Sequence, residues 1–205
     1  MTNSPFTQTV QSTMPSQTDS DVMIQAINSR FWYFWFFMVI GVPLCFVLIG
    51  VPLLVLSWTS SCFLHYSLWK VVPTHIARTT PGKALGFCFI PFFNWFYWNF
   101  VSLVGLSKDI NETLRQRGID LQVSVGLPLT YCVIPLLNIV TAFAIDLPIL
   151  ILEAQAVEIG QVGTLLSLLS NISGHVINFI GIIVLIFFYK SVKEGAITLL
   201  ERREQ

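Results

Sequence analysis

Charged residues are scarce in this chain of 205 residues: Asp, Glu, Lys and Arg make up 11% of it, against roughly 25% in an ordinary soluble domain. So few charges cannot coat the surface of a globular protein in water. The formal net charge is zero, so the chain as a whole has no attraction to nucleic acid, and no nucleic-acid partner is expected. Hydrophobic residues reach 54%. The composition therefore predicts an all-α integral membrane protein with several spans.

Catalytic and metal-binding patterns are also missing. The sequence has no HExxH, GxSxG or paired-carboxylate pattern, and its three His residues lie in different settings. The four Cys residues fall in apolar runs without metal spacing, so we interpret them as small buried residues. They are Cys45, Cys62, Cys88 and Cys132. We expect no cofactor, no metal and no enzymatic activity, and an intramembrane enzyme is only the third interpretation.

Lys and Arg are absent from the first 21 residues, which also lack an apolar run. A secretory signal begins with a basic stretch, so none is predicted here. The segment is instead rich in Ser, Thr, Gln and Pro. We interpret residues 1–29 as a disordered polar tail.

The run 31–69 has no charged residue and is nearly twice as long as the ~20 residues that one spanning helix needs. Two spans, near 31–49 and 52–70, therefore share it. The GVP sequence at 50–52 divides them, because Gly accepts turn dihedrals and Pro is tolerated where a helix begins. The earlier GVP at 41–43 is interpreted as a kink.

Two further apolar runs predict spans near 123–147 and 165–189. The outer loop between them holds three acids and no basic residue: Asp146, Glu153 and Glu158. The membrane domain thus covers residues 30–190. Residues 191–205 follow it as an amphipathic cytoplasmic tail.

The uncharged segment 84–106 is long enough to cross a bilayer, but Pro91 and Asn94 lie in its middle and interface-preferring aromatic residues follow. If it crossed, the basic loops on either side of it would lie on opposite sides of the membrane. If it enters and leaves on one side, all eleven Lys and Arg lie together, as the preference of basic residues for the cytoplasm predicts. We therefore expect four spans plus a Pro-broken re-entrant or interfacial segment at 84–106, with both termini cytoplasmic. Five spans are the alternative.

Two segments of the chain share a short sequence pattern. FCFIPFFN at 87–94 and YCVIPLLN at 131–138 match at Cys, Ile, Pro and Asn. Paired Pro-broken segments build the mid-membrane site of many transporters, whereas Pro kinks with Asn hydrogen bonds between helices need no solute. Both interpretations stay open for the residues concerned, which are Pro91, Asn94, Pro135 and Asn138.

In the last predicted span, Asn171, His175 and Asn178 follow i, i+4, i+7 spacing and share one helix face. A proton relay is one interpretation, because His titrates near neutral pH. Helix packing through interhelical hydrogen bonds is the other, and we favour it because this run has no carboxylate.

Basic residues beside aromatic ones predict a cytoplasmic surface that docks on lipid headgroups or on a partner. Its residues are Arg78, Lys83, Trp95, Trp98, Lys108, Arg115 and Arg117.

The stretch RTTPGKALGFCFIPFFNWFYWNFVSLVGLSKDIN, residues 78–111, resembles a motif of uncharacterised bacterial integral membrane proteins with a TPGKAxGFxFIPFFN core. Residues 80–94 match this core. The resemblance implies an integral protein of a bacterial inner or internal membrane and assigns no activity.

The leading functional hypothesis is a non-enzymatic accessory or assembly subunit of a larger membrane complex. It depends on the missing catalytic set, the few charges in the spans and the basic cytoplasmic surface. Its partners would be the lipid bilayer and other membrane subunits or further copies of the chain. The alternative is a small oligomeric transporter or channel that uses the two IPxxN segments.

Overall fold

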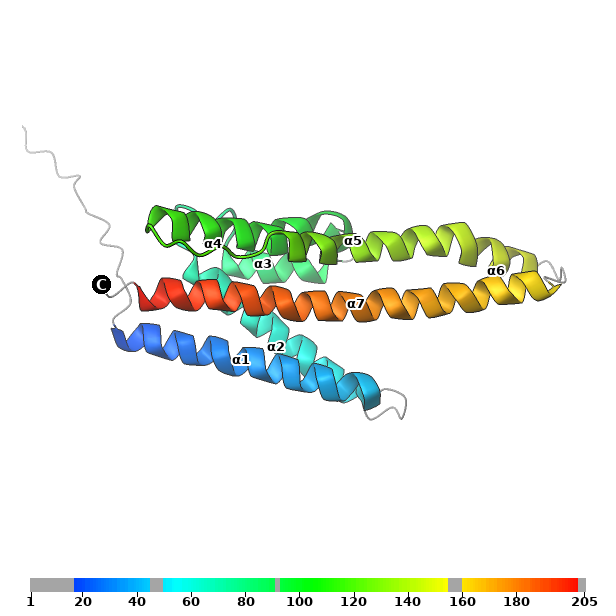
Figure 1. Ribbon diagram of the computed structural model, residues 1–205, viewed down its shortest axis with the longest axis horizontal. Coiled ribbons are helices and arrows are strands. Elements are labelled where there is room, and N and C mark those ends of the chain that lie inside the picture. Colours follow the sequence, from blue (N-terminus) through cyan, green and yellow to red (C-terminus); the bar gives the residue numbers. More distant parts are fainter. Residues whose placement is uncertain (1–16, 45–49, 91–92, 155–159, 203–205) are drawn as a thin grey trace, which may run out of the picture.

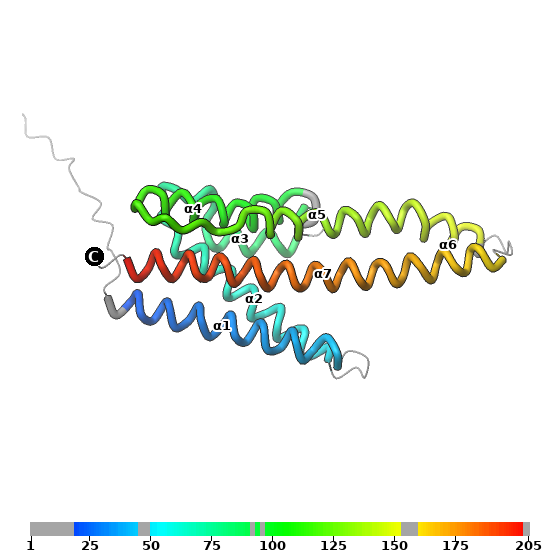
Figure 2. Tube along the Cα trace, viewed as in Figure 1, coloured from blue at the N-terminus to red at the C-terminus, as the bar shows by residue number. Residues whose placement is uncertain are grey.

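The computed structural model describes residues 17–44, 50–90, 93–154 and 160–202, and these ranges contain helices but no strand. The long helix α7 (Gly160–Glu201) runs the length of the molecule (Figure 1). On one side of it, α1 (Gln17–Leu44) and α2 (Gly50–Val71) form an antiparallel hairpin. The start of α1 and the end of α7 lie at the same end of the molecule (Figure 2).

A second long helix lies against α7 on its other side (Figure 1). It is continuous through three labelled parts: α5 (Gly126–Thr141), the π-helical η5 (Ala142–Asp146) and α6 (Leu147–Ala154). Figure 1 shows α6 and the first turns of α7 extending beyond the ends of α1 and α2.

Within the described ranges, three helices are long and apolar enough to cross a membrane: Gly50–Val71, Gly126–Leu152 and Gly160–Glu201. The prediction of a helical protein with transmembrane helices is confirmed to this extent. The predicted span 31–49 falls in α1 and in residues outside the described ranges, and α1 is not among these three helices. Four spans are therefore not confirmed.

The predicted disordered tail 1–29 is wrong for residues 17–29, which form the first turns of α1. Asp19 stands in the first turn, where a carboxylate favours the positive end of the helix dipole. Further along, Ile27, Phe31 and Phe34 recur at helical spacing and are buried against the rest of the protein. The polar composition of residues 17–29 hid Ile27, the first of these three positions.

The predicted outer loop is also corrected, because most of its residues are helical. Asp146 ends η5 and lies within the long helix, not in a loop. The helix continues through α6 because an Ile- and Leu-rich sequence follows, in which Pro148 is tolerated beside the wider π-helical turn. At the other boundary, α7 continues without a break through the predicted tail to Glu201. Val192 and Ala196 are fully buried there, so this tail packs on the core.

Between α2 and α5 the chain forms a second, shorter hairpin of helices. The descending arm consists of α3 (Pro81–Gly86) and η2 (Phe87–Phe89). The returning arm consists of the π-helical η3 (Asn94–Trp98) and η4 (Phe100–Val104), followed by α4 (Gly105–Gln116). The predicted break at Pro91 lies outside the described residues. Gly118, with φ of +66°, ends the hairpin, and this left-handed backbone favours glycine.

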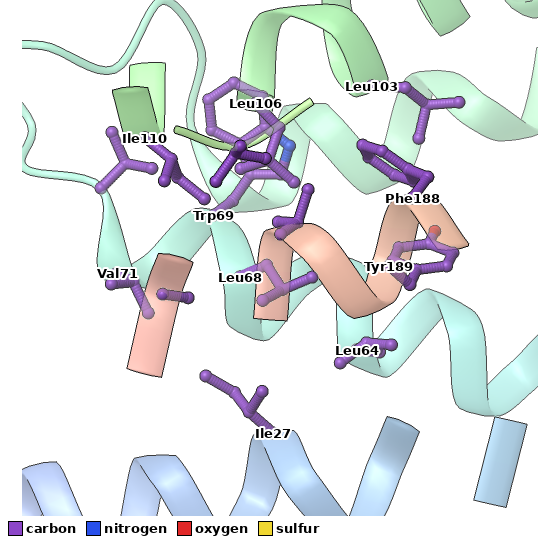
Figure 3. Packing of buried hydrophobic residues seen from close by; sticks show 14 of the residues in the cluster. Ile27, Leu64, Leu68, Trp69, Val71, Leu103, Leu106, Ile110, Phe188 and Tyr189 are labelled. Carbon is purple, nitrogen blue, oxygen red and sulfur yellow. The ribbon is translucent and has the colours of Figure 1, made fainter. Parts of the chain in front are cut away.

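The hydrophobic core lies where α1, α2, α4 and α7 meet (Figure 3). Figure 3 shows Leu68 of α2 between Ile27 of α1 and the side chains of α4. Leu106 and Ile110 of α4 are fully buried, because apolar residues four positions apart share one face. Each such side chain contributes about 1.5–3 kcal/mol when it is removed from water.

Candidate functional site

The two arms of the short hairpin are joined at the carbonyl oxygen of Ala84. This oxygen accepts hydrogen bonds from Trp98 Nε1 at 3.0 Å and from Cys88 Sγ at 3.1 Å, and Ser102 Oγ lies 3.3 Å from it. Ala84 itself is fully buried. At the start of α3, Thr80 Oγ1 accepts from the backbone N–H of Lys83, and Pro81 occupies the first helical position. The local sequence thus fixes the descending arm at its start and at its centre.

The returning arm is π-helical, and this determines which side chains share a face. The backbone N–H of Asn99 donates to the carbonyl of Asn94, five residues earlier, so Asn99 stacks one turn after Asn94. In an α-helix the same two residues would be rotated apart by about 140°. The wide turn therefore directs two amides to one side of the arm.

Opposite the returning arm, His65 of α2 is 97% buried. Its Nε2 lies 2.6 Å from Ser102 Oγ and accepts a hydrogen bond from Trp69 Nε1 at 3.1 Å. An indole N–H can only donate, so Nε2 is the acceptor and the neutral ring carries its proton on Nδ1. Among the described residues, Nδ1 has no hydrogen-bond partner.

A cavity of about 220 Å³ lies between α2, both arms of the short hairpin, α5 and α7. We call it the break cavity. Its lining includes His65, Cys62, Cys88, Asn94, Asn99 and Pro135. Like His65 Nδ1, the Oδ1 of Asn94 is buried without a partner in the described part of the chain. None of the described lining residues is Asp, Glu, Lys or Arg.

The break cavity brings together parts of the two IPxxN segments. Asn94 of the first segment and Pro135 of the second both line it. Asn138 lies elsewhere, because its Nδ2 donates to Asn178 Oδ1 on α7 at 2.9 Å. The second Asn therefore ties α5 to α7, as the helix-packing interpretation expects for such residues.

The other polar residues of α7 lie apart from this cavity. His175 is exposed, and Asn171, also exposed, donates within its own helix to the carbonyl of Ser167. An open pocket of about 530 Å³ lies between Asn171 and Asp146, and Ser170 Oγ donates to Asp146 Oδ1 at 2.7 Å. Asn171, His175 and Asn178 thus occupy one helix without forming a shared site.

The predicted docking residues fall into two groups. Lys83 and Lys108 are exposed, and Trp95 lies in η3. Trp98 is not available for docking, because it is buried and its indole is bonded to Ala84. Arg78 forms an ion pair with the buried Asp109.

Two further docking residues, at the end of α4, have partners of their own. Arg115 donates to both carboxylate oxygens of Glu112, and these bonds hold the pKa of Glu112 below its ordinary value. Arg117 Nη1 donates to the carbonyl of Leu199 at 2.7 Å and so ties α4 to the end of α7. Partial burial lowers the pKa of Arg117.

Comparison of the chain with protein-family models, curated proteins and solved structures finds no significant match. Within the residues that the structure describes, no three His, Cys, Asp or Glu side chains gather in a way that could hold a metal ion. The chemistry available in the break cavity is therefore hydrogen bonding to a ligand by uncharged groups, with two thiols close by.

Proposed function

We propose that this chain is a small membrane transporter for an uncharged ligand, which binds in the break cavity. One observation carries the proposal: two residues that line the same cavity each have a buried polar atom without a partner in the described part of the chain, the donor His65 Nδ1–H and the acceptor Asn94 Oδ1. A buried polar atom without a partner costs about 1–3 kcal/mol, so such a pair is expected where a ligand completes the hydrogen bonds. The uncharged lining favours an uncharged ligand, because a buried charge needs a counter-charge.

The proposal includes a four-span topology for α1, α2, the continuous α5–α6 helix and α7. The short hairpin 81–117 would be re-entrant, and its irregular backbone is supported by bonds such as those to Ala84. Helix α4 lies at one end of the molecule, together with the start of α1 and the end of α7 (Figure 1). Because basic residues prefer the cytoplasmic side of a membrane, this end would be cytoplasmic. A bacterial inner or internal membrane, inferred from the resemblance of residues 80–94, remains part of the proposal.

Cys62 and Cys88 line the cavity and allow a direct test. A variant with Ser at positions 45 and 132 keeps only these two thiols. We would reconstitute it in vesicles and apply a membrane-impermeant methanethiosulfonate to each side in turn. A matched variant that keeps only Cys132, which is fully buried, sets the background.

A transporter opens its binding position to each side alternately. We therefore expect the cavity thiols to react from both sides, at a rate about tenfold or more above the Cys132 background. A state that opens the cavity to one side for about a tenth of the time is sufficient for this rate. Reaction from one side only would contradict transport and indicate a static binding site. A rate equal to background from both sides would overturn the proposal.

The accessory-subunit hypothesis stays a prediction, and one feature of α7 favours it as a second candidate. Asn171 and His175 expose their side chains on an apolar helix that extends beyond α1 and α2 (Figure 1). Polar residues in a spanning helix usually face another helix. Purification of a tagged copy from its own membrane in mild detergent tests this, since a stoichiometric foreign subunit would establish the accessory role. A particle that contains only this chain would contradict it.

A further inference from the structure

A second hollow adjoins the break cavity. This apolar groove, of about 370 Å³, lies between the α1–α2 hairpin on one side and α5 and α7 on the other. Its lining is mostly aliphatic and includes Met38, Val42, Leu54 and Ile182. Several residues line both hollows, namely Trp58, Ser61, Tyr131, Pro135 and Leu185. The polar cavity and the apolar groove therefore adjoin, and one ligand with a polar end and an apolar end matches the two parts.

The two parts differ in chemistry. Among its described lining residues, the break cavity has one donor without a protein partner, on His65, and one such acceptor, on Asn94. A hydroxyl group has the chemistry that suits both atoms, because its oxygen accepts a hydrogen bond while its proton is donated. The groove contains no Asp, Glu, Lys or Arg among its described lining residues, and apart from Ser61, Tyr131 and Asn178 these residues offer mainly apolar contact.

We infer that the ligand is a single-chain lipid-like amphiphile with an uncharged hydroxyl headgroup, drawn from the bilayer. The hydroxyl binds in the break cavity and the alkyl chain lies in the groove. This inference rests on the proposed function and specifies its ligand class. A small polar solute would contact only the cavity, whereas a pure hydrocarbon would leave the His65 and Asn94 atoms without partners.

The source of the ligand determines which contacts decide binding. An alkyl chain that moves from lipid into the groove exchanges one apolar environment for another, so its transfer contributes little. The hydrogen bonds of the hydroxyl are made in a cavity that has no competing charge, so they discriminate between ligands. Headgroup chemistry should therefore control selection, while the groove controls whether a chain fits.

Photolabelling of the purified full-length protein tests this inference. The probe is hexadecanol with a diazirine in mid-chain, and the comparison probe has the same chain with a trimethylammonium headgroup. Unlabelled hexadecanol should displace the alcohol probe from the wild-type protein, and unlabelled hexadecyltrimethylammonium should not. Equal displacement by both would overturn the inference, and this measurement needs no variant.

Two pairs of variants locate the site. Ile182→Trp fills the groove, and Ile183→Trp makes the same change on the adjacent, exposed position of α7. Asn94→Leu removes the acceptor, and Asn171→Leu makes the same change on the exposed surface. We expect Ile182→Trp and Asn94→Leu to reduce labelling about tenfold, because loss of one well-placed hydrogen bond or of the space for a chain lowers binding by roughly this factor. The control variants Ile183→Trp and Asn171→Leu should stay within about twofold of the wild type.

The outcomes separate this inference from the proposed function. Equal labelling of Ile182→Trp and Ile183→Trp would overturn the lipid-like ligand. If the cavity thiols still reacted from both sides, the transporter would stand, with a small polar solute as its ligand. Failure of both the labelling and the thiol reaction would overturn the two proposals together.

Discussion

The carboxylate of Asp109 accepts three hydrogen bonds from Arg78: from its backbone N–H at 3.0 Å, from Nε at 2.8 Å and from Nη2 at 2.6 Å. The two residues lie 31 positions apart, and this contact joins the start of the short hairpin to its final helix. Gly105 makes room for it, because a Cβ there would approach Arg78 Cδ to 2.8 Å. The ion pair therefore holds the chain just before α3 against α4 and fixes the two arms relative to each other.

Replacement of Asp109 by Asn should destabilise the protein. The Asp109 side chain is 4% exposed and that of Arg78 is 43% exposed, so solvent screening reduces the loss below that of a fully buried pair, to about 2 kcal/mol. Thermal unfolding in detergent, followed by Trp fluorescence, measures the change. The matched control is Glu112→Gln, which removes the exposed partner of Arg115 and should change the midpoint much less. Equal effects of the two variants would show that Asp109 has no special structural role.

The two Asn residues of the IPxxN segments should respond in opposite ways to replacement by Leu. Asn138→Leu breaks the bond to Asn178 and should cost about 0.6–1.7 kcal/mol, the range for hydrogen bonds between membrane helices. Asn94→Leu removes an oxygen that has no partner in the described chain, so stability should be unchanged or higher. Unfolding in a mild denaturing detergent compares them. A larger loss for Asn94→Leu would mean that Asn94 stabilises the fold and is not reserved for a ligand.

Much of this fold follows from hydrophobic runs and their breaks. The GVP sequence at 50–52 correctly predicts where α2 begins, and the apolar runs predict the three long helices. The start of α1 is predicted wrongly, because a polar average composition conceals a single apolar face. The helix that continues through α6 is also missed, because an acidic residue is interpreted as the end of a span. Such boundaries depend on tertiary contact.

The candidate site was only partly predictable. The repeated IPxxN pattern identified Asn94 and Pro135, both of which line the cavity. His65 was missed, because its partner Ser102 lies 37 residues away and no motif links them. The stacking of Asn99 on Asn94 was missed as well, because it depends on a π-helical turn that periodicity does not reveal. A polar residue repeated every five positions in an apolar segment was the one signal that could have indicated it.

The interaction of Glu112 with Arg115 predicts a local pH dependence at the end of α4. Hydrogen bonds from Arg115 lower the pKa of Glu112 from its ordinary value of 4.5, so the ionised form is favoured in the folded state. Its contribution is present above pH 4.5 and is lost as the pH falls through the lower, folded-state pKa. Hydrogen exchange at the end of α4 should therefore be constant from neutral pH down to about 4.5, after correction for the intrinsic rate, and rise below it. In Glu112→Gln this rise should be absent, and an identical rise in both proteins would contradict the assignment.

The four-span topology predicts that the two ends of the short hairpin lie on the same side of the membrane. Lys83 in α3 and Gln116 in α4 are both exposed. Gln161 is exposed as well, and it lies at the start of α7, far from the end of this helix at Glu201. Single cysteines at these positions, in a variant without other thiols, can be tested with an impermeant maleimide on intact cells and on inverted vesicles.

We expect Lys83→Cys and Gln116→Cys to react only in inverted vesicles and Gln161→Cys only in intact cells, because the re-entrant hairpin returns to the basic side. In the five-span alternative, the segment between Lys83 and Gln116 crosses the bilayer, so these two cysteines would react from opposite sides. That result would also remove the basis for a cavity at a re-entrant break, since Asn94 would then lie in an ordinary span. The labelling of Gln161→Cys confirms in each case that the reagent is confined to one side.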